Sequence, residues 1–271
     1  MYTYSYLIAD LGLLLIWFAL FLLRKDIRKE MLVMSTLFGI AGIFSQYIYT
    51  IDWWRPLTIT GTRIGIEDFL FGFWVGGISA IIYEELFKKK LSKRKFKKAF
   101  PAYLIILSLL SVGILFGGSF YLLKLNSFYS SLIAFIFPTL FIWLKRNDLI
   151  LDSLTTGLLL PIIGLVWFWI PEYFTPGWVQ GHWLFQNLSG IIILKAPLED
   201  LIWGFAAGAY IGPLYEFLLV FIEKFDNPLW LIYTVSITKY WFSLVFLLLG
   251  LNRQSARRIG SPEISSKLDI S

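Results

Sequence analysis

Long apolar segments separated by short polar ones dominate the pattern along the chain. Runs of about 18 or more mostly apolar residues are typical of membrane helices, because a helix needs about 20 residues to cross the hydrocarbon core. The sequence predicts eight such helices, at residues 6–23, 31–50, 66–87, 100–123, 128–144, 154–170, 198–222 and 229–251. We therefore expect an all-α polytopic membrane protein.

An acidic pattern occurs twice along these segments. Acidic dipeptides at 67–68 and 199–200 each open an apolar helix, and the spacing to the next shared glutamate, from 67 to 84 and from 199 to 216, is the same. The residues repeated at an offset of 132 are Glu67, Asp68, Gly72, Phe73, Gly76, Tyr83 and Glu84, which correspond to Glu199, Asp200, Gly204, Phe205, Gly208, Tyr215 and Glu216. Such self-similarity at a fixed offset indicates an internal repeat.

The repeat also predicts the domain organisation. Residues 28–31 resemble residues 146–149 at an offset of 118, so the second half carries about fourteen extra residues before its acidic dipeptide. We predict one membrane domain, residues 1–251, with repeats at about 1–124 and 125–251, followed by a polar tail at 252–271. Because each repeat has four helices, both halves enter the bilayer from the same side, as in transporters with parallel repeats.

Charge and composition narrow the function classes. The chain is 58% hydrophobic and carries 24 basic and 18 acidic residues, one histidine and no cysteine. A cluster of His and Cys metal ligands is therefore excluded, and no Gly-rich nucleotide-binding motif is present, so we expect no metal and no cofactor. Fifteen of the basic residues fall in alternate loops, eight of them between 88 and 98. This bias predicts that these loops are cytoplasmic and contact anionic lipid headgroups rather than nucleic acid.

The acidic dipeptides are the main candidates for chemistry, because ionisable side chains in membrane segments are costly. Two effects oppose each other at these positions. The helix dipole at a first turn favours the charged carboxylate, whereas burial in apolar surroundings favours the protonated carboxyl. Pro197 suits the first helical position. Neighbouring residues on a helix point about 100° apart, so the two acids of a pair cannot share a face.

Aromatic residues gather in the long loops, 51–65 and 171–196, that precede the two acidic dipeptides. We interpret most of their tryptophans, together with His182, as anchors at the membrane interface. A lid over a cavity is the alternative, because a long loop on one side of a bundle is often functional.

Other polar positions receive structural roles. Lys239, near the middle of the last predicted helix, is interpreted as the counter-ion of an inward-facing carboxylate. Glu84 and Glu216 lie near the cytoplasmic end and are expected to form pairs or to hold the repeats together. Asp10 and Gln46 are expected to make hydrogen bonds between helices.

These motifs resemble those of a known family. Pro197-Leu198-Glu199-Asp200 matches the Pro-x-Glu-(Glu/Asp) motif of the membrane-integral lycopene cyclases, which occur as two related polypeptides or as one fused chain. The first copy, Gly65-Ile66-Glu67-Asp68, is similar but has glycine where the family has proline. That family is similar in helical arrangement to the UbiA-type prenyltransferases, which implies a UbiA-like bundle.

The resemblance implies an enzyme that protonates a terminal double bond of a linear polyene such as lycopene within the bilayer. The carbocation closes onto a neighbouring alkene and loses a proton, without net redox change, which makes the enzyme an intramolecular lyase or isomerase. It implies Glu199 as the proton donor, assisted by Asp200, with Glu67 and Asp68 as the equivalent acids of the first half. Aromatic side chains stabilise cations, and those on the motif helices are Trp74, Phe73, Trp203, Phe205 and Tyr210. The expected location is the cytoplasmic membrane of a bacterium or archaeon.

Two other functions stay open. A UbiA-like prenyltransferase would need carboxylates at helical i, i+4 spacing to hold magnesium and diphosphate. The positions four residues after the acidic dipeptides are Phe71, Gly72, Trp203 and Gly204, which argues against that function. A transporter or lipid-binding scaffold without catalytic activity is the second alternative.

Overall fold

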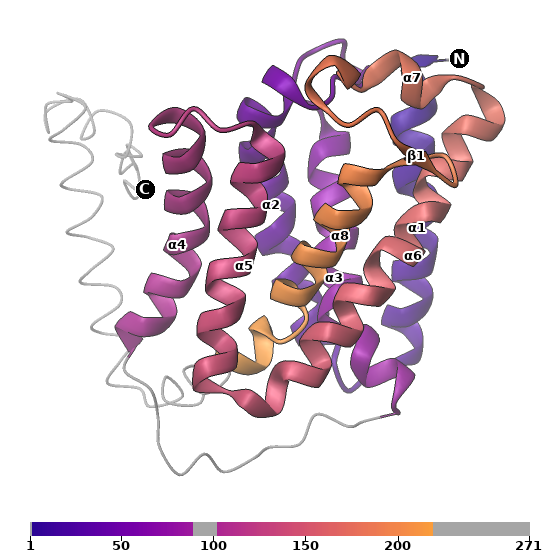
Figure 1. Ribbon diagram of the computed structural model, residues 1–271. Helices are drawn as coiled ribbons and strands as arrows, with labels where there is room; N and C mark the ends of the chain where they lie inside the picture. The colour runs from indigo at the N-terminus through magenta and orange to yellow at the C-terminus, as the bar shows by residue number, and fades with distance from the viewer. Residues whose placement is uncertain (1, 89–101, 219–271) are drawn as a thin grey trace, which may run out of the picture. The chain divides into compact units, whose positions relative to one another are not determined.

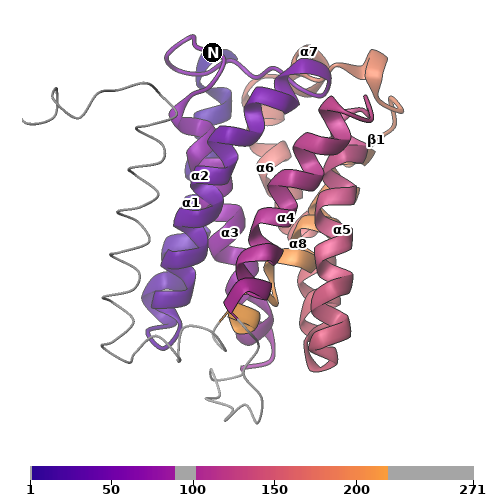
Figure 2. The ribbon, with the colours of Figure 1, turned by 90° about the vertical axis from the view of Figure 1, so that its left-hand side faces the viewer.

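The computed structural model describes residues 2–88 and 102–218 of the chain, most of them helical. The long helices are α1 (Tyr2–Leu23), α2 (Arg28–Asp52), α3 (Ile66–Leu86), α4 (Ala102–Tyr121), α5 (Ser127–Lys145), α6 (Ile150–Phe174) and α8 (Leu198–Ile211). They run up and down in a bundle (Figure 1). Turned by 90°, the bundle shows α1, α2 and α3 on one side and α4 and α5 on the other (Figure 2).

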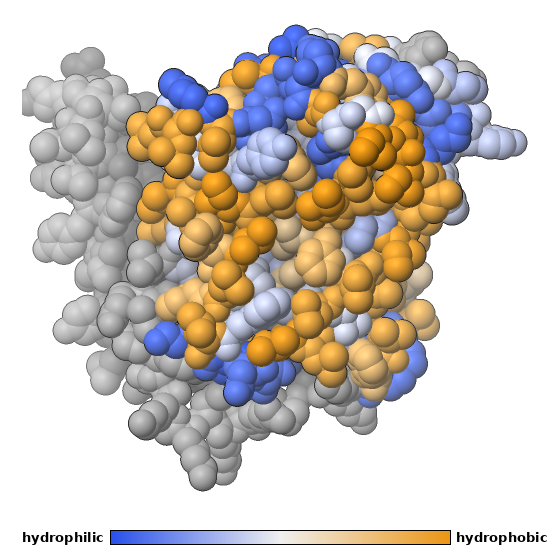
Figure 3. All heavy atoms as spheres, in the orientation of Figure 1, coloured by the Kyte–Doolittle hydropathy of each residue, from blue (hydrophilic) through white to orange (hydrophobic). Residues whose placement is uncertain are grey.

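Six helices of the described residues are long and apolar enough to cross a membrane, the last of them running from Leu198 to Leu218. Their outer faces carry large apolar side chains such as Leu15, Phe137 and Ile162, which are 73%, 61% and 60% exposed. Figure 3 shows the resulting apolar surface between two hydrophilic ends. This confirms the all-α polytopic membrane fold. The predicted helix at 229–251, the tail and most of the basic loop lie outside the described residues.

The two halves pack their helices in the same way. α2 packs along α3 as α6 packs along α8, and α1 contacts α3 as α5 contacts α8. The repeated glycines lie where these helices approach most closely. A Cβ atom at Gly72 would lie 2.1 Å from the carbonyl oxygen of Phe38, and one at Gly208 would lie 2.7 Å from that of Thr156. Small residues four apart allow such close contact between membrane helices.

The helix packing changes which residues of α2 correspond to which residues of α6. The Cβ of Gly76 would meet the carbonyl of Met34, and that of Gly208 would meet the carbonyl of Thr156, so Met34 corresponds to Thr156. The offset is therefore 122 rather than 118. The cause is a 3₁₀ turn at Asn147–Leu149, which delays the start of α6 to Ile150. The boundaries of the two repeats and of the membrane domain stay predictions.

The two long loops join each other at the end of the bundle where the chain begins (Figure 1). The second loop contains α7 (Trp178–His182) and a short hairpin of β1 (Ile192–Ile193) and β2 (Ala196–Pro197), which the sequence did not predict. The N–H of Arg55 donates to the carbonyl of His182 at 2.8 Å, and the N–H of Leu184 donates to that of Trp53 at 2.7 Å. These bonds connect the two halves of the chain.

The tryptophans of these loops are not interfacial anchors, so that interpretation is wrong. Trp53, Trp54, Trp178 and Trp183 are at most 6% exposed, and His182 is 8% exposed. Trp54 and Trp183 pack with ring centroids 5.3 Å apart. The rings are buried because they pack against one another and because two of them, Trp53 and Trp183, donate hydrogen bonds to the carboxyl of Asp200. The loops thus cover the end of the bundle.

Candidate active site

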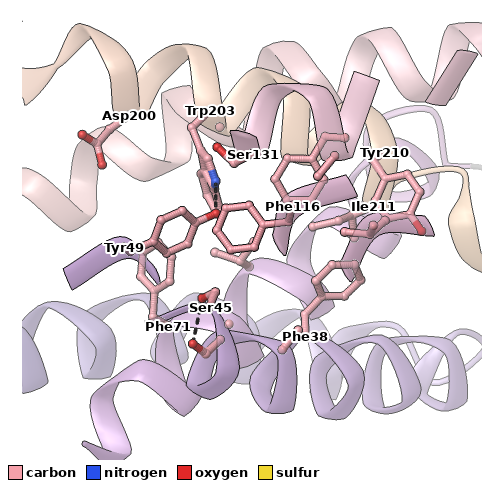
Figure 4. Close-up of a pocket in the computed structure, with 18 of the residues that line it drawn as sticks. Phe38, Ser45, Tyr49, Phe71, Phe116, Ser131, Asp200, Trp203, Tyr210 and Ile211 are labelled. Carbon is pink, nitrogen blue, oxygen red and sulfur yellow. Dashed lines mark hydrogen bonds between the residues drawn. The ribbon is translucent and has the colours of Figure 1, made fainter. Parts of the chain in front are cut away.

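An apolar cavity of about 490 Å³ lies inside the bundle. Side chains from α2, α3, α4, α5, α6 and α8 line it, together with Trp53 and Trp54 from the first loop. Among the described lining residues, Asp200 is the single acidic or basic side chain. Figure 4 shows Asp200 at one end of the cavity and Tyr210 with Phe38 at the other. Pockets of this kind, mostly apolar with a small number of polar groups, are typical of small-molecule sites.

Aromatic rings line the cavity between Asp200 and Tyr210 (Figure 4). We call this set the aromatic box, and its members are Tyr49, Trp53, Phe71, Phe116, Phe135 and Trp203. The Nε1–H of Trp203 donates to the hydroxyl of Tyr49 at 3.0 Å. The Tyr49 ring lies 5.1 Å from that of Phe116 and 5.2 Å from that of Trp53, centroid to centroid. Ring faces attract cations, so the box could stabilise positive charge on a bound molecule.

Asp200 is held by tryptophans from both long loops. Its Oδ2 accepts a hydrogen bond from Nε1 of Trp53 at 3.3 Å and one from Nε1 of Trp183 at 2.8 Å. Trp53 belongs to the first half of the chain and Trp183 to the second. The carboxyl therefore lies at the junction of the two halves, with both indoles on the same oxygen.

Asp10, on α1, makes a second arrangement of this kind. Its side chain is fully buried, and its Oδ1 accepts from Nε1 of Trp74 at 3.1 Å and from Nε1 of Trp167 at 2.8 Å. Both indoles line the cavity, whereas Asp10 does not. Asp10 thus makes the hydrogen bonds between helices that the sequence predicts, and it fixes two aromatic walls of the cavity.

The two predicted glutamates have equivalent contacts away from the cavity. Oε1 of Glu67 accepts from the N–H of Ile59 at 2.6 Å, and Oε1 of Glu199 accepts from the N–H of Ser189 at 2.5 Å. Each glutamate thereby ties the preceding loop to the start of its helix. Neither is among the residues that line the cavity.

Asp68, the counterpart of Asp200 in the first half, also lies outside the cavity lining. Its Oδ1 accepts from the hydroxyl of Tyr6 at 3.0 Å, and its Oδ2 accepts from the N–H of Gly65 at 2.7 Å. Of the four predicted acids, the structure therefore brings only Asp200 to the cavity. The catalytic roles of all four stay predictions.

Some of the predicted aromatic residues lie on the helix face that lines the cavity, and others lie on a different face. Trp74, Trp203 and Tyr210 line the cavity, but Phe73 and Phe205 do not. Phe73 packs against Trp17 at 5.0 Å between centroids, and Phe205 is 38% exposed on the outer face of the bundle. The reason is rotation, because Phe73 comes two positions after the lining Phe71 and Phe205 two positions after the lining Trp203, and two positions turn a helix by about 200° to its opposite side.

Acidic side chains also gather at the end of the bundle remote from the long loops. Glu30 and Glu84 are buried there, and Glu30 interacts electrostatically with Glu84, Asp152 and Glu216. Within the described ranges, no three acidic, His or Cys side chains have the geometry of a metal site. The predicted pairing of Glu84 and Glu216 stays a prediction, and the predicted counter-ion, Lys239, lies outside the described residues.

Sequence reasoning missed Tyr49, Trp53, Trp167 and Trp183 as parts of the site. The sequence does not distinguish such residues from interfacial anchors, since a tryptophan at a helix end is typical of a membrane interface. The stronger signal was Asp10, because an acid within a membrane helix requires hydrogen-bond donors nearby, and indoles are the donors that the chain offers.

The fold defines an integral membrane protein with a mostly apolar cavity inside its helix bundle. Among the described lining residues, the cavity has a single carboxyl group. A family model described as lycopene cyclase matches residues 1–86 and 126–218, which is most of the chain. The chain therefore belongs to the lycopene cyclase family, as its acidic motifs predict. No curated protein and no solved structure matches the chain. The similarity to UbiA-type prenyltransferases stays a prediction.

Proposed function

We propose that the protein is a carotenoid cyclase that closes the end group of a linear polyene by acid-initiated cyclisation. The observation that carries this proposal is the position of Asp200, the one acidic side chain among the described lining residues, at the end of a mostly apolar and aromatic cavity. Membership of the lycopene cyclase family supports the same substrate class. In this role Asp200 begins the reaction protonated.

The reaction begins when the carboxyl of Asp200 gives its proton to the terminal double bond of the polyene. The O–H bond breaks, a C–H bond forms, and the adjacent carbon becomes a tertiary cation. The π electrons of a neighbouring double bond then form the ring-closing C–C bond, which moves the positive charge into the ring. Loss of a ring proton to the carboxylate leaves a double bond and restores the acid. Substrate and product are isomers, so no oxidant or reductant is needed.

The aromatic box supports the cationic steps. One of its rings, Trp53, contacts Asp200 directly, and the rings line the cavity in which the positive charge would form and offer π faces to it. Water must also be kept out, because it would capture the cation as an alcohol. The joined loops with their buried tryptophans cover this end of the bundle and serve that purpose.

The structure favours Asp200 over Glu199 as the donor. Glu199 uses Oε1 to hold the N–H of Ser189 and does not line the cavity. Asp200 lines the cavity, and both of its indole donors bind Oδ2. In this proposal the proton is on Oδ1, because Oδ2 accepts from both indoles. The variants Asp200→Asn and Glu199→Gln separate the two assignments, because each removes the acidic proton of one candidate donor.

The test is to express the chain in cells that accumulate lycopene and to separate their pigments by chromatography. We expect monocyclic or bicyclic carotenoids in place of part of the lycopene. Unchanged lycopene, with the protein confirmed in the membrane fraction, would reject the proposal. Binding of the polyene without conversion would instead favour the lipid-binding or transport function.

A further inference from the structure

The two acidic motifs differ in the residue just before the helix, and this difference changes what the aspartate can do. In the first half that residue is Gly65, the N-cap of α3, whose N–H donates to Oδ2 of Asp68 at 2.7 Å. This bond is one half of a capping box, in which a side chain at the third helical position reaches back to the N-cap N–H. In the second half the N-cap of α8 is Pro197, which has no N–H to donate.

Because Pro197 has no N–H, the carboxyl groups of Asp68 and Asp200 accept hydrogen bonds from different donors. Asp68 uses one oxygen for the helix cap and the other for the hydroxyl of Tyr6. Asp200 uses Oδ2 for two indoles, and the residue three positions earlier offers nothing to Oδ1. The same aspartate in the same repeat position is therefore a capping group in the first half and a cavity group in the second.

A role in starting the helix does not explain the proline. Proline is favoured at the first helical position, but the structure places Pro197 one residue earlier, at the N-cap, which corrects the sequence-based position. Residues favoured at an N-cap are Ser, Thr, Asp, Asn and Gly, and the first half uses glycine there. Pro197 adopts φ −59° and ψ 142°, an extended conformation open to most residues.

We propose that Pro197 is a positioning residue that keeps Asp200 out of the helix cap, so that a carboxyl oxygen stays available to the polyene. This inference rests on the proposed cyclase function, and it assigns the chemistry of the chain to its second half. An N–H at position 197 would bind the oxygen that must hold the proton. It would also stabilise the carboxylate, because a hydrogen bond donated to the charged form favours that form.

The test compares two replacements of Pro197 that differ in a single group. Pro197→Ala introduces a backbone N–H, whereas lactic acid at position 197, incorporated as an ester in the chain, has the same methyl side chain but no N–H. We expect the alanine variant to convert lycopene at least about tenfold more slowly than the unchanged protein, at equal membrane expression. The lactic acid variant is expected to restore conversion relative to alanine. The melting temperature of the alanine variant is expected to be unchanged or higher, since it gains a cap.

A second readout needs no turnover. The infrared band of a protonated carboxyl, identified as that of Asp200 by its loss in Asp200→Asn, is expected in the unchanged protein and in the lactic acid variant. It is expected to weaken in the alanine variant. Equal conversion and equal infrared bands in the alanine and lactic acid variants would overturn the inference, whether both are active or both inactive. If the unchanged protein forms no cyclic product, the proposed function fails, and the infrared comparison alone then decides the role of Pro197.

Discussion

Replacing Asp200 by asparagine separates its chemistry from its structural contacts. Asparagine has nearly the same shape, and its amide oxygen can still accept from Nε1 of Trp53 and of Trp183, the two donors that hold Asp200. The amide has no acidic proton to give to a double bond. The variant therefore removes the proposed proton donor and keeps the indole contacts.

The contacts of Asp200 set the expected effect of each variant on the free energy of unfolding, and its proposed role as an acid sets the expected effect on conversion. Because both indole bonds are kept, Asp200→Asn is expected to change the free energy of unfolding by less than about 1 kcal/mol. Asp200→Leu would leave two indole N–H groups without their acceptor, at about 1–3 kcal/mol each, so it would be less stable by about 2–6 kcal/mol. A positioned general acid contributes about 10²–10⁴-fold to a rate, so conversion by the asparagine variant is expected to fall at least about a hundredfold.

The assay measures cyclic carotenoids by chromatography in lycopene-accumulating cells, with thermal unfolding in detergent as the stability control. Glu199→Gln is the comparison variant, since its amide oxygen can still hold the N–H of Ser189. We expect it to keep most of the conversion. Loss of conversion in Glu199→Gln together with normal conversion in Asp200→Asn would refute the assignment and restore Glu199 as the donor.

Two further predictions concern the first acidic motif and the cavity wall. Asp68→Asn can keep the bond from the hydroxyl of Tyr6 but not both of its bonds, so we expect a loss of about 1 kcal/mol of stability with conversion retained, checked by thermal unfolding and pigment analysis. Gly117 lines the cavity, and a Cβ atom there would meet no described atom within 4 Å, so Gly117→Leu is expected to fill the cavity and reduce conversion at least about tenfold. Gly118→Leu, at the next position and outside the cavity lining, is the matched control, and equal conversion by the two leucine variants would contradict the position of the cavity.

The membrane fold was predictable from the sequence because its main determinant is local. Apolar segments long enough to cross the bilayer must form helices, since each backbone N–H and C=O needs a partner inside the membrane. The repeated glycines were equally visible, and the structure gives their reason in the close contacts of Gly72 and Gly208 with a neighbouring helix. The register of α6 was not predictable in this way, because it depends on the short 3₁₀ turn at Asn147–Leu149.

The identity of the acid that faces the cavity was beyond the sequence. Helices α3 and α8 are apolar around most of their circumference, so periodicity does not tell the inner face from the outer one. The orientation of Glu199 is instead set by its bond to the N–H of Ser189, ten positions earlier in an irregular loop. The prediction that the loop tryptophans are interfacial was wrong for a related reason. The burial of Trp53 and Trp183 depends on the contact between two loops that are far apart in the chain.

The two acidic motifs differ in the residue that precedes the acidic dipeptide by two positions. Glycine in place of proline at position 65 marks the first motif as a departure from the family pattern. The structure adds that the glycine N–H is the donor that occupies Asp68. The sequence shows which of the two motifs has an N–H before the helix, but the structure is needed to show that this N–H binds the aspartate.

The central claim, ring closure begun by a proton from the enzyme, is tested most directly by a single turnover in heavy water. The purified protein is equilibrated in D₂O, mixed in excess with lycopene in detergent or lipid, and the cyclic product is analysed by mass spectrometry. The account predicts that each ring closed in the first turnover carries one deuterium from the exchanged carboxyl of Asp200, and that Asp200→Asn gives no labelled ring. A cyclic product without deuterium would contradict it.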